Sequence, residues 1–163
     1  MKHITAEPVD SVESFPIAIV VSHFNRPVTN ELQRGALREL IRRGLSEQDI
    51  TLVEVPGAVE IPLVVQRLAM QKKVAAIIAL GAVIRGETSH YDYVCEQVSQ
   101  GCQRVALDYN IPVIFGVLTT DDEAQAWERL GGRHGHKGID AADCAIAMQS
   151  ILTQIDKISS NSD

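Results

Sequence analysis

Four short runs of apolar residues are spaced along the chain, and longer amphipathic stretches lie between them. The runs cover residues 17–21, 52–55, 75–84 and 111–118, and three of them are continuously apolar instead of alternating with polar residues. An uninterrupted apolar run is typical of a strand that helices cover on both faces of a parallel sheet. The order of runs and stretches therefore predicts an α/β fold with a right-handed, doubly wound parallel sheet of four strands.

The stretches between these runs carry apolar residues at helical spacing. In the first stretch, apolar residues recur every three or four positions, and Gly44 follows them where a glycine commonly ends a helix. Ser89, followed three residues later by Asp92, is expected to form a capping box at the start of the third helix. The predicted helices cover residues 29–43, 61–70, 89–109, about 121–130 and about 137–158.

The two ends of the chain lie outside these predicted elements. Residues 1–15 are too polar for a core strand, although Val9 and Val12 could serve an edge strand. We expect this segment to be an arm that adds to a sheet, either its own or that of a neighbouring subunit. Residues 159–163 are polar and are expected to fray. At 163 residues, the whole chain, 1–163, has the size of one domain.

Charge and composition exclude several classes of function. Lys and Arg number 15 against 21 Asp and Glu, which gives a net charge of −6 and disfavours a binder of nucleic acid or of an anionic membrane. The longest apolar stretch, 74–84, is too short to span a bilayer, and residues 1–15 lack the apolar core of a secretory signal. The three cysteines have no metal-ligand spacing, which fits a reducing compartment and no structural zinc. We therefore expect a cytoplasmic protein that acts on small molecules.

In a parallel sheet, ligands bind outside the carboxyl ends of the strands, so the segments after each apolar run are the candidates for chemistry. These segments are 22–25, 56–62, 81–90 and 115–120. In the third, a turn at Gly86 opens a helix whose first N–H groups have no partner and could hold an anion. A turn that binds nothing is an equal alternative for this segment. Its glycines do not have the dinucleotide-binding spacing, and residues 131–137 do not form a Walker loop.

Four side chains near this edge are candidates for a role, each with an ordinary structural alternative. His90 could be a neutral general base, although a surface histidine at a helix start is the commoner case. Phe24 could be a platform for a flat heterocycle or a core residue. Glu60 could bind the hydroxyls of a polyol or cap the second helix. Arg129 could meet a phosphate or face solvent.

Two further histidines, two of the cysteines and the tryptophan are not expected to take part in chemistry. His134 and His136 have no third ligand nearby in the sequence, so a metal site is disfavoured. Cys95 and Cys102 lie seven residues apart on one helix face and are expected to be small core residues, not nucleophiles. Trp127 is assigned to packing or to an interface.

The candidate segments, in their order and spacing, resemble the 6,7-dimethyl-8-ribityllumazine synthase family over about residues 16–155. The carriers are Phe24-Asn25, VPGAVEIP at 55–62, ALGAVIRGETSHYDYV at 79–94, IPVIFGVLTT at 111–120, and Glu128-Arg129 followed by Lys137-Gly138. The resemblance implies a flavodoxin-like, three-layer αβα sandwich. It also implies a transferase of riboflavin biosynthesis that condenses 5-amino-6-(D-ribitylamino)uracil with 3,4-dihydroxy-2-butanone 4-phosphate, releases phosphate and water, and needs no metal and no cofactor.

The resemblance also implies roles at matching positions. His90 would shuttle protons, and the residues that would bind the phosphate are Gly86, Glu87, Thr88 and Arg129. The residues that would hold the aminouracil and its ribityl chain are Phe24, Asn25, Ala58, Val59, Glu60, Ala82, Val83, Ile84, Phe115 and Lys137. Of these, Phe115, Arg129 and Lys137 match positions that a neighbouring subunit contributes.

The family resemblance further implies a homo-oligomer. Its unit would be a pentamer. The short segment 131–137 is similar to that of members whose pentamers close into a sixty-subunit icosahedral shell, and riboflavin synthase is a candidate partner.

The chain departs from the family at Ser22-His23 and Arg26-Pro27, which bear on the rim of the pocket, and at His134 and His136, where Ala and Asn are common. One alternative is a flavin- or lumazine-binding or shell-forming paralogue with weak or no catalysis. A nucleotide-binding enzyme would rest on fold analogy alone.

Overall fold

A parallel sheet of four strands forms the middle layer of the computed structural model, which describes residues 1–160. The strands are β1 (Ile17–Ser22), β2 (Ile50–Val55), β3 (Ala76–Ile84) and β4 (Val113–Thr120). They are ordered β2-β1-β3-β4, and every neighbouring pair is parallel. Each apolar run predicted as a strand is a strand, and the predicted α/β sandwich is confirmed.

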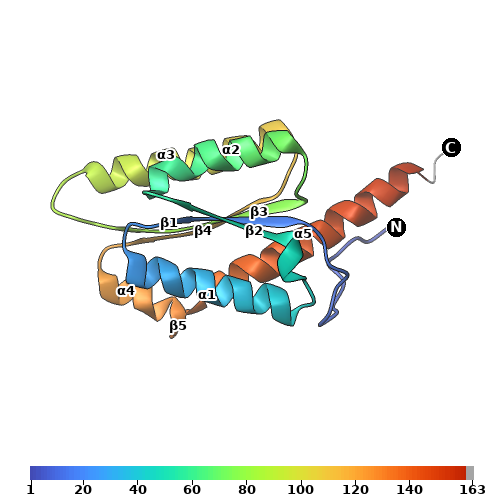
Figure 1. The fold of residues 1–163 in the computed structure, drawn as a ribbon, viewed down its shortest axis with the longest axis horizontal. Helices are drawn as coiled ribbons and strands as arrows, with labels where there is room; N and C mark the ends of the chain where they lie inside the picture. Colours follow the sequence, from blue (N-terminus) through green and yellow to red (C-terminus); the bar gives the residue numbers. More distant parts are fainter. Residues whose placement is uncertain (161–163) are drawn as a thin grey trace.

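Helices cover both faces of the sheet. They are α1 (Arg26–Arg42), α2 (Ile61–Gln71), α3 (His90–Tyr109), α4 (Glu123–Glu128) and α5 (Lys137–Ser160). Figure 1 shows α2 and α3 on one face and α1, α4 and α5 on the other. The far end of α5 extends beyond the sheet, and the chain's N-terminus lies at the same end of the molecule. Two short 3-10 turns, η1 (Glu47–Asp49) and η2 (Ala58–Glu60), precede β2 and α2.

The strands feed two separate hydrophobic cores because successive side chains of a strand point to opposite faces. On β1, Ile17, Ile19 and Val21 pack toward α1 and α5, whereas Ala18 and Val20 pack toward α2 and α3. All five of these side chains are at most 2% exposed. This double-sided burial explains why the strand sequences are continuously apolar.

The sequence did not predict the hairpin between α4 and α5. Strand β5 (Leu130–Gly132) pairs antiparallel with β6 (Gly135–His136). The predicted fourth helix therefore ends at Glu128, two residues early, because Leu130 enters the hairpin. Two residues, Arg133 and His134, turn the chain between the two strands.

Two of the predicted helix ends can be compared with the structure. Gly44 follows α1 with a φ of +108°, which confirms it as the terminal glycine. The predicted capping box is wrong, because Ser89 has helical dihedrals (φ −70°, ψ −1°) and its side chain makes no capping hydrogen bond. A side chain reaches back to the first turn only from an extended residue. The N–H of His90 donates instead to Thr88 Oγ1 at 3.3 Å.

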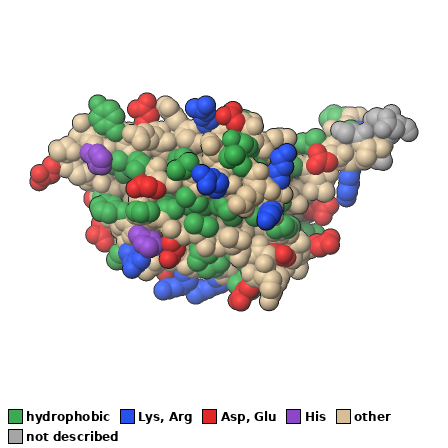
Figure 2. All heavy atoms as spheres, turned by 45° about the horizontal axis from the view of Figure 1, so that its top comes forward, with side chains coloured by type: hydrophobic (Ala, Val, Ile, Leu, Met, Phe, Trp, Pro, Cys, Tyr) green, Lys and Arg blue, Asp and Glu red, His purple; other side chains and the backbone are tan. Residues whose placement is uncertain are grey.

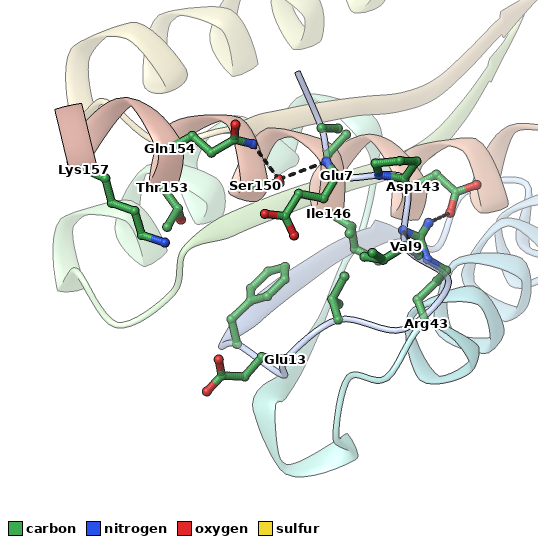
Figure 3. A pocket seen from close by; sticks show the side chains of 15 residues that line it. Glu7, Val9, Glu13, Arg43, Asp143, Ile146, Ser150, Thr153, Gln154 and Lys157 are labelled. Atoms are coloured by element: carbon green, nitrogen blue, oxygen red, sulfur yellow. Dashed lines mark hydrogen bonds and ion pairs between the residues drawn. The ribbon is translucent and has the colours of Figure 1, made fainter. Parts of the chain in front are cut away.

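The N-terminal arm adds to no sheet within its own chain, so that alternative is wrong. Figure 3 shows the arm beside α5, with Ser150 and Gln154 directed toward it. The amide of Gln154 donates to Thr5 O at 2.7 Å, and Arg43 donates to the carbonyls of Val9 and Asp10, each at 3.0 Å. Addition of the arm to a neighbour's sheet stays a prediction.

At the other end, α5 runs two residues further than predicted, to Ser160. The rest of the predicted frayed tail, 161–163, lies outside the described residues. Among residues 1–160, none of the helices is both long enough and apolar enough to cross a membrane.

Candidate active site

A cleft of about 390 Å³ opens where β3 ends, between η2 and the start of α3. This volume is within the range of small-molecule sites, and the position is the one expected for a ligand of a doubly wound sheet. Most of the residues predicted for the substrates line it. The full lining is Phe24, Gly57, Ala58, Val59, Glu60, Ala82, Val83, Ile84, Gly86, Thr88, His90, Tyr91 and Val94.

Phe24 stands at the cleft on the loop between β1 and α1. It is 72% exposed, so the alternative that it is a core residue is wrong. The loop is held by backbone hydrogen bonds, from His23 N to Val55 O at 2.8 Å and from Phe24 N to Pro56 O at 3.1 Å. The ring is therefore fixed in position but uncovered, as a stacking platform requires.

The residues around Phe24 that depart from the family make their own contacts. The guanidinium of Arg26 lies 3.1 Å from His23 Nδ1, and His23 Nε2 lies 3.3 Å from Glu54 Oε2. Pro27 occupies the first turn of α1, where its missing N–H removes no helical hydrogen bond. These departures alter the rim of the cleft and leave the backbone of the loop intact.

Ser22, the remaining departure, is buried below the cleft. Its side chain is 1% exposed, and among the described residues its hydroxyl has no hydrogen-bond partner. A Cβ added to Gly81 on the adjacent strand would lie 2.9 Å from Ser22 Oγ. The hydroxyl therefore fills the space that the glycine leaves.

Glu60 lies on η2 and lines the cleft from the side opposite the start of α3. It immediately precedes α2, yet its side chain makes no capping hydrogen bond there, so the helix-cap alternative is wrong. A Cβ added to Gly57 would lie 3.3 Å from Glu60 Oε2. The carboxylate thus extends over Gly57 in the cleft, where it can accept hydrogen bonds from hydroxyl groups.

The start of α3 brings the other polar groups to the cleft. Gly86, Thr88 and His90 line it, and no atom lies within 4 Å of a Cβ placed on Gly86, so the loop is open there. Helix α3 is 20 residues long, and the positive end of its dipole favours an anion at its start. The guanidinium of Arg85 is held nearby by Asp121 at 2.9 Å and lies 4.3 Å from the centre of the Tyr91 ring.

Three predicted site residues lie outside the cleft, on the free edge of β4. Phe115 and Lys137 line one hollow on that edge, and Arg129 lines the next hollow together with Lys137. The guanidinium of Arg129 donates to Gln125 O at 2.8 Å. Within one chain, therefore, these three side chains do not meet Phe24 or His90.

Two further predicted residues are near the cleft but do not line it. Asn25 has a left-handed backbone (φ 63°), and its amide donates to Ala82 O at 3.1 Å, which ties the β1–α1 loop to β3. Glu87 is exposed on the loop before α3. Their direct contact with a substrate stays a prediction.

Sequence reasoning missed Gly57, Tyr91 and Val94, which also line the cleft. Once His90 is placed at the cleft, helical geometry brings Val94, four positions further, onto the same face, and Tyr91 lies three positions before Val94 on the neighbouring part of that face. Burial raises the pKa of the Tyr91 phenol above its usual value. At the cleft it is therefore a neutral hydroxyl and not a base.

The cysteines behave as the sequence predicted. Burial raises the pKa of the Cys95 thiol, and it raises that of Cys102, which is 2% exposed, to about 11. A buried thiol with a raised pKa is a poor nucleophile. No thiolate chemistry is thus assigned to α3.

The hollow under the N-terminal arm and the two histidines of the β5–β6 hairpin form no metal site among the described residues. The hollow under the arm, about 430 Å³, has no His or Cys in its described lining (Figure 3). His134 and His136 face different carboxylates, Glu128 and Glu31. Among residues 1–160, no group of three His, Cys, Asp or Glu side chains could hold a metal ion.

Comparisons with known proteins agree with this geometry. A family model described as 6,7-dimethyl-8-ribityllumazine synthase matches residues 14–153. Two curated relatives of that name, from Coxiella burnetii strains CbuG_Q212 and RSA 493 / Nine Mile phase I, are each 55% identical over 143 residues. The matched region covers 88% of this chain and 95% of each relative.

Proposed function

This chain belongs to the 6,7-dimethyl-8-ribityllumazine synthase family, and from that premise we propose that its cleft is the active site of this synthase. The enzyme is a transferase of riboflavin biosynthesis. It condenses 5-amino-6-(D-ribitylamino)uracil with 3,4-dihydroxy-2-butanone 4-phosphate and releases phosphate and water. One observation carries the proposal: an exposed aromatic ring, a carboxylate, an anion-binding helix start and His90 all line one cavity in a chain of this family.

The cleft can orient both substrates without covalent help from the protein. Phe24 stacks on the pyrimidine, Glu60 accepts hydrogen bonds from the ribityl hydroxyls, and Val83 and Ile84 line the ring pocket. The phosphate binds at the loop from Gly86 to the start of α3. Holding an amine beside a ketone in this way removes much of the entropic barrier to their reaction.

The reaction itself is a series of proton transfers around the condensation. The primary amine attacks the ketone and a first water leaves as the imine forms. Loss of a proton from the neighbouring carbon then breaks the bond between carbon and the phosphate oxygen, and the enol left behind becomes a ketone. The second nitrogen attacks that ketone and closes the ring with loss of a second water. His90, at the cleft, takes and returns protons in these steps. The N–H groups at the start of α3 stabilise the departing phosphate.

We further propose that a neighbouring subunit completes the site. This is supported by the placement of Phe115, Arg129 and Lys137 on the free edge of β4, outside their own chain's cleft. A pentamer lets that edge face the cleft of the next subunit, with the N-terminal arm reaching a neighbour's sheet, and pentamers of this kind can close into a sixty-subunit shell. Riboflavin synthase, which acts on the product, is the candidate partner.

Exposed apolar side chains also support an assembly. Leu63 is 65% exposed, Tyr93 61% and Leu107 73%. Figure 2 shows hydrophobic side chains gathered in a band across the face turned forward. Large apolar areas of this kind are usually covered by a partner.

The first experiment mixes the purified protein with both substrates, without metal or nucleotide, and follows the fluorescent lumazine. We expect product with saturable kinetics in both substrates. Absence of product above the uncatalysed background, from folded and assembled protein, would contradict the proposed activity. A yellow ligand bound without turnover would point instead to a binding paralogue.

The second experiment tests the shared site by mixing two inactive variants. His90→Ala and Arg129→Ala subunits are dissociated, combined in equal amounts and reassembled. A site between two subunits is intact only when an Arg129→Ala subunit supplies His90 and a His90→Ala subunit supplies Arg129. With equal mixing each condition holds half of the time, so about one quarter of wild-type activity returns. A mixture as inactive as its components would place both residues in the site of one chain.

A further inference from the structure

His136 is a nearly buried histidine that the proposed reaction does not use. Its side chain is 11% exposed, although it lies on a hairpin at the surface of the fold. The ring contacts three elements that are far apart in the sequence: α1, the β5–β6 hairpin and α5. Among residues 1–160, no group of three His, Cys, Asp or Glu side chains that could hold a metal ion includes it.

The ring caps the start of α5. Its Nδ1 accepts hydrogen bonds from the backbone N–H groups of Gly138 at 3.1 Å and Ile139 at 3.3 Å. These are first-turn donors that the helix itself leaves without a partner. Only an imidazole with an unprotonated Nδ1 can accept them, so the neutral ring carries its proton on Nε2, which lies 3.4 Å from Glu31 Oε1.

Close packing against α1 fixes where the ring lies. A Cβ added to Gly35 would lie 2.1 Å from His136 Cε1, so the ring occupies the space above that glycine. A Cβ added to Gly138 would lie 2.3 Å from the backbone oxygen of Leu32. Helices α1 and α5 therefore meet here with no room for the ring to shift.

The same short segment carries two residues of the proposed neighbour-facing half-site. Leu130 pairs with His136 in the hairpin, and Lys137 N donates to Arg129 O at 2.8 Å. Arg129 and Lys137 are thus tied to each other by the backbone, and to α1 through the ring between them. Loss of the ring would remove the contacts that fix this segment against α1 and the start of α5.

We infer that His136 is a positioning residue, which holds Arg129 and Lys137 in place for the cleft of the adjacent subunit. This inference rests on the proposed function. His136 touches no substrate, and its effect passes through the two cations. Its removal should therefore weaken binding of the phosphosugar more than it slows the chemical steps.

Steady-state kinetics of three variants test this role. His136→Ala should raise KM for the butanone phosphate by about fivefold to tenfold and keep kcat within about threefold of wild type. A raised KM with a nearly unchanged kcat is expected when a substitution weakens substrate binding and not the chemical steps. His136→Asn keeps an acceptor for the helix N–H groups and should restore KM to within about threefold. Ile146→Ala, which removes a core side chain of α5 itself, is the matched control for lost stability.

The outcomes separate positioning from stability. Ile146→Ala should lower Tm as much as His136→Ala does and leave KM unchanged. Equal KM increases in both variants, an unchanged KM in His136→Ala, or no recovery in His136→Asn would each overturn the inference. Gly35→Ala, which displaces the ring and keeps its hydrogen-bonding groups, should reproduce the KM increase.

Two further measurements distinguish failure of this inference from failure of the proposed function. With butanone phosphate below its KM, mixed oligomers of His136→Ala and His90→Ala should be more active than the average of the two variants, and mixed oligomers of His136→Ala and Arg129→Ala should not; the reverse pattern overturns the inference. If the wild-type protein shows no turnover, the proposed function fails. Hydrogen exchange then still tests whether His136 caps the start of α5. The amides of Gly138 and Ile139 should be protected in wild type and in His136→Asn, and unprotected in His136→Ala; exchange that is equally fast in all three overturns it.

Discussion

Phe24 is an aromatic side chain that folding leaves in solvent. Burying a phenylalanine is worth about 1.5–3 kcal/mol, and at 72% exposure most of that stabilisation is not realised in the single chain. The backbone hydrogen bonds of the loop nevertheless hold the ring at the cleft. A substrate ring that stacks there gains apolar burial which the fold has left available.

In the proposed mechanism His90 carries the proton transfers, and its replacement tests that role. His90→Ala should lower kcat by at least about tenfold, because general acid–base catalysis commonly contributes 10²–10⁴-fold and water can replace part of it. Thermal stability should not change, since the side chain is exposed.

The matched control is His3→Ala, which removes an exposed histidine from the arm. Both variants are assayed with the two substrates at saturation. Equal kcat in His90→Ala and wild type would remove His90 from the mechanism.

At the scale of the elements, α2 and α3 pack closely at one glycine. A Cβ added to Gly101 would lie 2.6 Å from both Cβ and Cγ of Pro62, at the start of α2. Gly101→Val should therefore push the two helices apart and destabilise the fold by about 1–3 kcal/mol, the usual effect of overpacking. Since α3 and η2 border the cleft, substrate affinity should fall as well.

Thermal unfolding measures the first effect, with a decrease in Tm of roughly 2–4 °C per kcal/mol for a chain of this size. Gln103→Val, at an exposed position of the same helix, controls for the change in helix propensity. Equal Tm values for the two variants would show that the helices tolerate the extra atoms.

One side chain, Arg43, makes several of the contacts that hold the N-terminal arm to the fold. Arg43 is 14% exposed, pairs with Asp143 at 2.8 Å and donates to two carbonyls of the arm. Burial, together with the nearby Glu39, raises the pKa of the Asp143 carboxyl, and the Arg43 guanidinium opposes that shift. Loss of Arg43 removes every one of these contacts at once.

Arg43→Ala should therefore release the arm and make it a better substrate for proteases. Limited digestion with an enzyme that cleaves after glutamate, followed by mass spectrometry, measures the rate of cleavage at Glu7 and Glu13. Arg38→Ala, an exposed arginine on the same helix, is the control. Cleavage at the wild-type rate in Arg43→Ala would mean that other contacts hold the arm.

At the scale of the whole molecule, activity should depend on assembly. Arg129 and Lys137 cannot serve their own chain's cleft from the free edge of β4, so a separated subunit lacks half of the proposed site. Sedimentation should show a particle of five times the 17.8 kDa chain mass, or a multiple of it. Turnover should fall in step with dissociation on dilution. Full activity in a 17.8 kDa species would contradict the shared site.

Local pattern was enough to predict the sheet, the order of the helices and the segments of the cleft. Residues 17–21 and 75–84 predict buried strands because burial on both faces excludes polar side chains from every position. The motifs around Gly86 and His90 led to the family whose model matches residues 14–153. Both signals lie within short stretches of chain and need no knowledge of distant contacts.

Tertiary structure alone decided which side chains meet. The amide of Asn25 is bound by the carbonyl of Ala82, 57 residues later, and His136 lies against Glu31, 105 residues earlier. Phe24 is exposed because the chain from β2 to η2 holds its loop, and Arg129 is remote because β4 ends the sheet. Such placements depend on packing between segments that are far apart in the chain, and no local spacing encodes them.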